Sequence, residues 1–251
     1  MPTATRSSIR SMPELDLPPM FRLITLREVG DALAHARGIA VDEGAGTLVY
    51  VGRFDLAEFA VVLEPDEPLR TARRAFYAGM TALADALSVF APPEKPIAFA
   101  WPDAIRIDGG LVGGGRLAWP EGASGSEPPD WLVFGAMIRT VAIGAEEAGL
   151  WPLAATLEGE GFDDAGSGRL VESFARHLAV ATDSWQEHGF GEIAKSYLAR
   201  LTPEQSVRRD IDETGDLLVR RMLGEKPQRR SLAAALAAPT WLDPATGGPR
   251  K

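Results

Sequence analysis

Four short apolar segments follow one another between residues 97 and 141, with turns and loops between them instead of helices. Strands joined by short turns pair readily in the antiparallel sense, whereas a parallel pair needs a long crossover. Gly109-Gly110 marks one such turn, and the Gly-, Ser- and Pro-rich residues 121–130 read as a surface loop. The sequence therefore predicts a mixed or antiparallel sheet from residues 97–101, 105–108, 111–119 and 131–141.

Helical segments flank these strands. Apolar residues recur at spacings of three and four between residues 69 and 89, which predicts a long helix with one apolar face packed on the sheet. We also expect helices over residues 168–186 and 193–201. A strand over residues 21–26, a helix over 27–37 ended by Gly38, and a hairpin of strands 47–51 and 58–63 complete an α+β pattern.

The chain divides into three parts by composition and pattern. Residues 1–19 are rich in Ser and Pro and are expected to form a flexible arm. Residues 20–201 carry the helices and strands of the main domain. Residues 202–251 are expected to form a small C-terminal domain and tail, which starts with a hairpin over residues 209–220 with Gly215 in its turn.

Composition excludes several kinds of function. The chain has no Cys and only three His, so disulfides, thiolate nucleophiles and a His- or Cys-based metal site are not expected. The net charge of −9 argues against nucleic-acid binding. No apolar run approaches the ~20 residues that cross a bilayer, and residues 1–12 lack the apolar core of a secretory signal. We expect a cytoplasmic protein that does not bind membranes.

Several segments, in order, resemble the biotin/lipoate A/B protein ligase family. Residues 100–114, with Trp101-Pro102-Asp103, are similar to the family's central block, which reads Lys-Trp-Pro-Asn-Asp, a strand, a turn, a Lys and Ala-Gly. Residues 131–139 are similar to the apolar strand that ends in Gly-Ile-Asn, and residues 185–201 to the helices that close the domain. The hairpin at 211–220 resembles the start of the biotin ligases' small β domain. The resemblance implies a class II synthetase-like sheet flanked by helices, with a small C-terminal β-rich appendage.

The resemblance also implies a chemistry. Family members activate biotin, lipoate or octanoate with ATP and pass the acyl group to a Lys of a lipoyl or biotinyl acceptor domain, and some transfer it from acyl carrier protein instead. Both routes need donors that stabilise negative charge on phosphate or oxyanion. The implied ligands are therefore ATP and a small carboxylate, the implied partner is an acceptor domain, and a homodimer is left open.

Several family positions that handle anions carry different residues here. Leu111 stands at the position of the family Lys, and Arg139 at that of the Asn. The Arg- and Gly-rich loop is reduced to Gly52-Arg53, while Ala100 and Ala104 replace a Lys and an Asp. A leucine cannot carry charge or donate a hydrogen bond, so no catalytic residue is assigned. The candidates for ligand binding are Arg53, Trp101, Asp103, Gly113, Gly114, Gly115, Arg116 and Arg139.

Each candidate also has a purely structural interpretation. Trp101 can pack in the core with Asp103 capping a turn, the glycine run can be a strand bulge, and the arginines can be surface residues. Three hypotheses follow: an enzyme of the ligase or acyltransferase class, a non-catalytic protein that binds a carboxylate or a carrier domain, and a structural module. They differ in whether Arg53 and Arg139 face one pocket and whether side chains such as Phe99 and Leu111 fill it.

Overall fold

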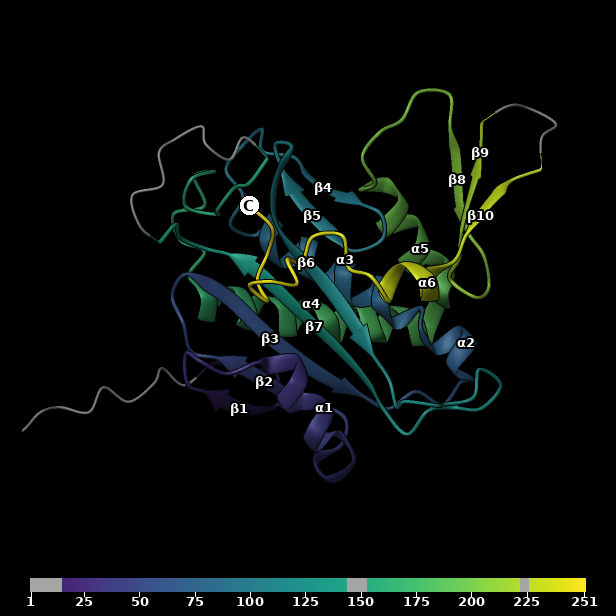
Figure 1. The fold of residues 1–251 in the computed structure, drawn as a ribbon, viewed down its shortest axis with the longest axis horizontal. Coiled ribbons are helices and arrows are strands. Elements are labelled where there is room, and N and C mark those ends of the chain that lie inside the picture. The colour runs from purple at the N-terminus through teal and green to yellow at the C-terminus, as the bar shows by residue number, and fades with distance from the viewer. Residues whose placement is uncertain (1–14, 144–152, 222–225) are drawn as a thin grey trace, which may run out of the picture.

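A mixed sheet of seven strands runs through the centre of the protein in the computed structural model, which describes residues 15–143, 153–221 and 226–251 (Figure 1). The strand order is β1-β2-β3-β7-β6-β5-β4. The strands are β1 (Arg22–Leu26), β2 (Thr47–Val51), β3 (Leu56–Leu63), β4 (Ile97–Ala100), β5 (Ala104–Ile107), β6 (Gly110–Ala118) and β7 (Leu132–Arg139).

Strand pairing follows the connections. β1 and β2 are parallel and are joined through a helix, whereas every other neighbouring pair in this sheet is antiparallel. The register of β5 on β6 shifts between Ile105 and Arg106, which marks a bulge. The predicted mixed sheet and the predicted hairpin of β2 and β3 are confirmed.

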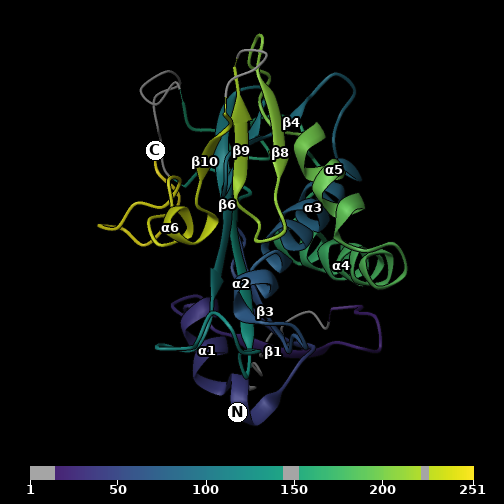
Figure 2. The ribbon, with the colours of Figure 1, turned by 90° about the vertical axis from the view of Figure 1, so that its right-hand side faces the viewer.

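One face of the sheet is covered by α2 (Leu69–Ala72), α3 (Ala75–Ser88), α4 (Ser167–His188) and α5 (Phe190–Ala199), as Figure 2 shows edge-on. The sheet presents Phe59 and Phe134 to this layer, and both rings contact Phe174 of α4, with centroids 4.5 and 5.7 Å away. Most of α3 is buried because the helix lies between the sheet and α4 and α5. This layer holds the main hydrophobic core.

Three predicted helices have different bounds in the structure, and the helix expected over residues 193–201 is α5, Phe190–Ala199. The first, α1, spans Ala32–Glu43, so Gly38 lies inside the helix and does not end it. Asp31 caps its start by accepting a hydrogen bond from Ala34 N, and Gly44, with φ +74°, ends it. The predicted helix over residues 69–89 is interrupted at Arg73, where hydrogen bonds span three residues instead of four and divide α2 from α3.

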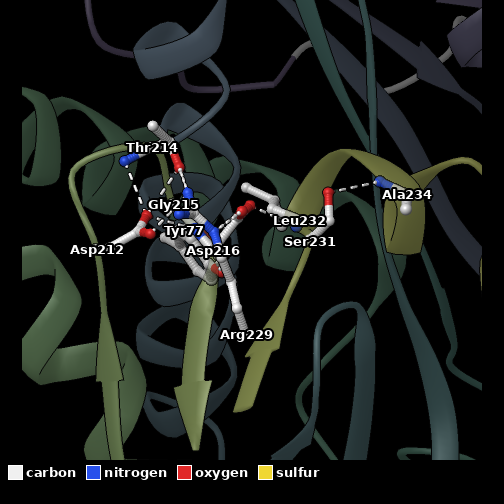
Figure 3. Close-up of polar contacts among 9 residues, drawn as sticks. All are labelled: Tyr77, Asp212, Thr214, Gly215, Asp216, Arg229, Ser231, Leu232 and Ala234. Atoms are coloured by element: carbon white, nitrogen blue, oxygen red, sulfur yellow. Dashed lines mark hydrogen bonds and ion pairs between the residues drawn. The ribbon is translucent and has the colours of Figure 1, made fainter. Parts of the chain in front are cut away.

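The predicted C-terminal hairpin is confirmed and belongs to a second, three-stranded sheet. Its strands are β8 (Arg208–Ile211), β9 (Leu217–Arg220) and β10 (Gln228–Arg230), and α6 (Leu232–Leu236) follows. Figure 3 shows how the hairpin turn is fixed: Tyr77 of α3 donates its hydroxyl hydrogen to the Gly215 carbonyl at 2.7 Å. The Asp216 carboxylate accepts from Arg229 Nε and from the Leu232 amide, which joins the start of α6 to the turn.

Both ends of the described chain pack on the main sheet or its helices. Asp16 bonds to Glu172 and Arg176 of α4, while the rest of the predicted arm, up to residue 14, lies outside the described residues. Residues 239–251, called the C-terminal segment below, lie on the face of the main sheet opposite α3 and α4 (Figures 1 and 2). Among the described residues, no helix is long and apolar enough to span a bilayer.

Candidate functional site

The sheet face opposite the main core is shared between α1 and the C-terminal segment. Helix α1 packs on β2, β3 and β7. A separate apolar cluster lies on this face over β3, β5, β6 and β7. Because side chains alternate between the two faces of a strand, its strand residues point away from the main core. This cluster contains Leu56, Ala104, Leu111, Met137 and Trp241.

Trp241 is the centre of this cluster. Its side chain is 1% exposed, and its indole N–H donates to the Gly115 carbonyl at 3.1 Å. The ring lies so close to Gly114 that a Cβ on that residue would be 2.4 Å from the indole Cδ1. The same Cβ would be 2.1 Å from the Asp103 carbonyl oxygen, so both the Asp103 backbone and the Trp241 ring require a glycine at this position.

Asp103, at the end of the Trp-Pro-Asp block, also binds the C-terminal segment. Its carboxylate is fully buried and accepts two hydrogen bonds from Thr240, at 2.7 Å from the hydroxyl and 3.1 Å from the amide. Burial raises the pKa of Asp103, because a charged carboxyl loses hydration there, and the two Thr240 donors oppose this shift.

Beside Trp241 the C-terminal segment and the sheet border an open cavity of about 560 Å³. Arg53 enters it from the loop between β2 and β3, and Arg139 from the end of β7. One side of the cavity therefore comes from the sheet and the other from the C-terminal segment. Its lining is Arg53, Asp55, Leu56, Glu58, Arg139, Asp243, Thr246, Gly247, Gly248, Pro249, Arg250 and Lys251.

Both arginines of the cavity make polar contacts. Arg53 forms a two-pronged ion pair with Asp55, at 2.5 and 3.0 Å, and this contact raises the pKa of Arg53 and lowers that of Asp55. Arg139 Nη2 donates to the carbonyl oxygens of Leu111, at 2.9 Å, and of Arg250, at 2.6 Å. Arg139 therefore connects β6 to the C-terminal segment while it lines the cavity.

A buried acid of the cavity lining, Glu58, has a partly buried base, Arg116, near it on the same face. Glu58 is 4% exposed and accepts a hydrogen bond from the Ala32 amide at the start of α1. Burial raises the pKa of Glu58 and lowers that of Arg116, because each charged form loses hydration. Arg116 interacts electrostatically with Glu58 and Asp31, and its Nε has no hydrogen-bond partner among the described residues.

The structure divides the predicted site residues into groups. Arg53 and Arg139 line one cavity, and Asp103, Gly114 and Gly115 bond or pack against the C-terminal segment beside it. Trp101 instead lies toward α3, where its indole N–H donates to Tyr77 at 3.2 Å and its ring packs on the main core.

Two further positions are closed to a ligand by their surroundings. A Cβ on Gly113 would be 1.9 Å from the Met137 carbonyl, so the backbone of β7 covers this residue. The side chain of Leu111 is buried in the cluster around Trp241. Phe99 is buried in the main core and does not fill the cavity.

Sequence reasoning did not single out Thr240, Trp241 or Glu58. Two signals were available: an isolated Trp-Leu pair in an otherwise small and polar C-terminal segment, and a Glu within the apolar run of β3. In the part of the chain that the structure describes, no group of three or more His, Asp or Glu side chains is arranged to hold a metal ion.

The sheet, its helical layer and the small C-terminal sheet define the class of protein. The profile of the Biotin/lipoate A/B protein ligase family matches residues 17–199, and the chain belongs to this family. The resemblance predicted from the sequence is thereby confirmed, and the class II synthetase-like fold with it.

Individual relatives agree with this assignment. The chain is 27% identical to a biotin–[acetyl-CoA-carboxylase] ligase of Paracoccus denitrificans over 183 residues, 66% of this chain and 74% of the relative. It is similar to the crystal structure of a biotin protein ligase-like protein of unknown function from Silicibacter sp. TM1040, with a TM-score of 0.76 and 26% identity over 88% and 98% of the two chains. The biotin protein ligase of Aquifex aeolicus shares the fold, with a TM-score of 0.64 and 16% identity over 84% and 95%.

Proposed function

We propose that the protein binds a biotinyl, lipoyl or octanoyl group on the sheet side of the cavity, as the free carboxylate or as the thioester of an acyl carrier. From the thioester the acyl group passes to the amine of a Lys on an acceptor domain: the amide bond forms, the carbon–sulfur bond breaks and the carrier thiol leaves. The observation that carries this proposal is the convergence of Arg53 and Arg139 on one cavity. The two arginines come from segments far apart in the chain, and guanidinium groups are strong donors to carboxylates. Membership of the ligase family supports the acyl chemistry.

The charge of the cavity favours a monoanion. On the sheet side of the cavity Arg53 and Arg139 lie among the carboxyl groups of Asp55 and Glu58, whereas Asp243, Arg250 and Lys251 belong to the C-terminal segment. This balance suits one carboxylate better than a triphosphate, which requires a larger excess of positive charge. Leu111 adds no charge at the position of the family Lys. The residues present therefore do not fit ATP well, and an acyl carrier thioester fits the proposed transfer as a donor.

A non-catalytic binding protein is the second candidate, and the buried side chain of Leu111 favours it. Turnover separates the two candidates. We would offer the purified protein an acceptor domain with either ATP plus biotin, lipoate or octanoate, or octanoyl acyl carrier protein, and measure acyl transfer by mass spectrometry. Transfer from the carrier without ATP is the expected result. Binding of one acid with no transfer from either donor would identify the binding protein instead.

Arg139→Gln tests the carrying observation. Loss of one charged hydrogen bond costs about 1.5–3 kcal/mol, so we expect roughly 10- to 150-fold weaker binding or transfer. Arg176→Gln is the matched control, because Arg176 pairs with Asp16 at the surface of α4, on the other side of the sheet. Equal effects of the two substitutions would contradict a role of Arg139 in ligand binding.

A further inference from the structure

The C-terminal segment lies on the residues of the central Trp-Pro-Asp block. Thr240 gives both its amide and its hydroxyl hydrogen to Asp103, and Trp241 covers Gly114 and bonds to the Gly115 carbonyl. These contacts involve three of the eight residues that the sequence offers as candidates for ligand binding: Asp103, Gly114 and Gly115. A polypeptide segment therefore takes up the hydrogen-bonding groups and the glycine-lined space of these residues.

The chain that leads into the C-terminal segment is anchored at the start of α6, away from the segment's contacts with the sheet. The start of α6 is held to the turn before β9 by the hydrogen bond from Leu232 N to Asp216, at 2.9 Å, and Ser231 caps the helix (Figure 3). Helix α6 ends at Leu236, and Pro239 follows three residues later. Proline often follows the end of a helix because it cannot continue it. The residues before Pro239 can stay in place while those after it move.

The C-terminal segment also holds its own shape. Arg250 N donates to the Trp241 carbonyl at 2.7 Å, and Asp243 N to the Gly248 carbonyl at 2.8 Å. Leu242 and Pro249 form an antiparallel bridge. Because these bonds lie within the segment, it can leave the sheet as a small hairpin. Only its contacts to the sheet are lost, chiefly those of Thr240, Trp241 and the Arg250 carbonyl.

We propose that the C-terminal segment is an intramolecular competitor of the acyl ligand, and that the ligand-binding face is fully open only when Trp241 leaves β6. This inference rests on the proposed function. Arg139 links the two states: in the closed state it donates to the carbonyl oxygen of Arg250, and a ligand carboxylate is a stronger acceptor for the same guanidinium. A ligand that binds only the open state has its apparent affinity reduced by the fraction of open molecules.

Trp241→Ala in the full-length protein tests this competition. The substitution removes the buried ring and its hydrogen bond, and so increases the open fraction. We expect the dissociation constant of biotin, lipoate or octanoate, measured by titration calorimetry, to fall at least ten-fold. Trp185→Ala is the matched control, because Trp185 is on α4, on the other side of the sheet, and its removal should leave the dissociation constant unchanged.

A second measurement follows the segment itself. Hydrogen exchange of the Thr240 amide, which donates to Asp103 in the closed state, should accelerate when the acid that binds is added to the wild-type protein. Exchange of the Leu232 amide, in the anchor at Asp216, should not change. Faster exchange at Thr240 together with tighter binding by Trp241→Ala supports the proposal.

The outcomes separate failure of this inference from failure of the proposed function. If an acid binds the wild type and Trp241→Ala equally, or binds the variant more weakly, the segment does not compete and the inference is overturned while the function stands. If none of the three acids binds either protein, although both are folded by circular dichroism, the proposed function is overturned and the inference with it.

Discussion

Tyr77→Phe is the substitution whose effect the structure defines most clearly. The Tyr77 side chain is fully buried at the point where α3, the turn after β4 and the C-terminal hairpin meet. Its hydroxyl donates to the Gly215 carbonyl at 2.7 Å and accepts from the Trp101 indole at 3.2 Å. Phenylalanine keeps the ring and its packing, so the substitution removes only these two hydrogen bonds.

The loss of stability depends on which polar groups the substitution leaves without a hydrogen bond. Gly215 is buried, so its carbonyl loses its only side-chain donor among the described residues, whereas the half-buried Trp101 can reach water. An unsatisfied buried polar group costs about 1–3 kcal/mol, and the net value of a hydrogen bond is about 1 kcal/mol. We expect the free energy of unfolding to fall by about 1.5–3 kcal/mol, or the Tm by about 3–10 °C for a chain of this size.

Urea denaturation followed by far-UV circular dichroism measures this loss. The slope of the transition should stay unchanged, because Phe buries the same surface, while the midpoint falls. Lys195→Ala is the control, since Lys195 pairs with Glu192 on the exposed side of α5 and should change stability little. If Tyr77→Phe lies within about 0.5 kcal/mol of wild type, the connection between α3 and the C-terminal hairpin does not have the role given to it.

Three further substitutions or titrations test other parts of the fold. Glu58→Gln should become more stable relative to wild type as the pH rises above the ordinary glutamate range. Burial raises the pKa of Glu58, so ionisation of Glu58 destabilises the folded wild type at higher pH. Denaturation of both proteins at pH 4 to 8 measures this trend. Gly79→Ala should lower stability by about 1–3 kcal/mol despite its better helix propensity, because its Cβ would be 2.4 Å from the Phe134 ring; a thermal melt that shows no loss would contradict this packing. Burial raises the pKa of both Tyr77 and Tyr197, so absorbance at 295 nm should show these two phenols un-ionised at pH 10.5 until the protein unfolds.

The spacing of apolar residues predicts most of the fold, because each helix or strand that buries one face carries apolar residues at the spacing of that face. The apolar spacing of residues 69–89 predicted helix packed on the sheet, and the apolar runs between residues 97 and 141 predicted its strands. The bounds of α1 were wrong because a glycine in a helix interior costs only about 1 kcal/mol, and Ala36 and Ala40, on either side of Gly38, are buried in the cluster between α1 and the sheet. The signal that ends the helix is the positive φ of Gly44, which composition does not reveal.

The candidate site is less visible in the sequence because it depends on contacts between distant segments. Arg53 and Arg139 were named as candidates, but the cavity they share is bordered by residues from Asp243 onward. The partner of Asp103 is Thr240, 137 residues away, and no local pattern predicts such a pair. For Trp101 the sequence was misleading. Its place in the family's central block suggested the wall of a pocket, but its indole N–H donates to Tyr77 in the main core.

Calorimetric titration of the wild-type protein with biotin, lipoate and octanoate shows whether this face of the sheet binds an acyl carboxylate. We expect saturable binding of one of these acids at a single site, weakened at least ten-fold in Arg139→Gln and unchanged in Arg176→Gln. Binding that Arg139→Gln leaves unchanged would place the ligand elsewhere. Absence of binding by folded wild-type protein and by folded Trp241→Ala would show that this face of the sheet does not bind an acyl carboxylate.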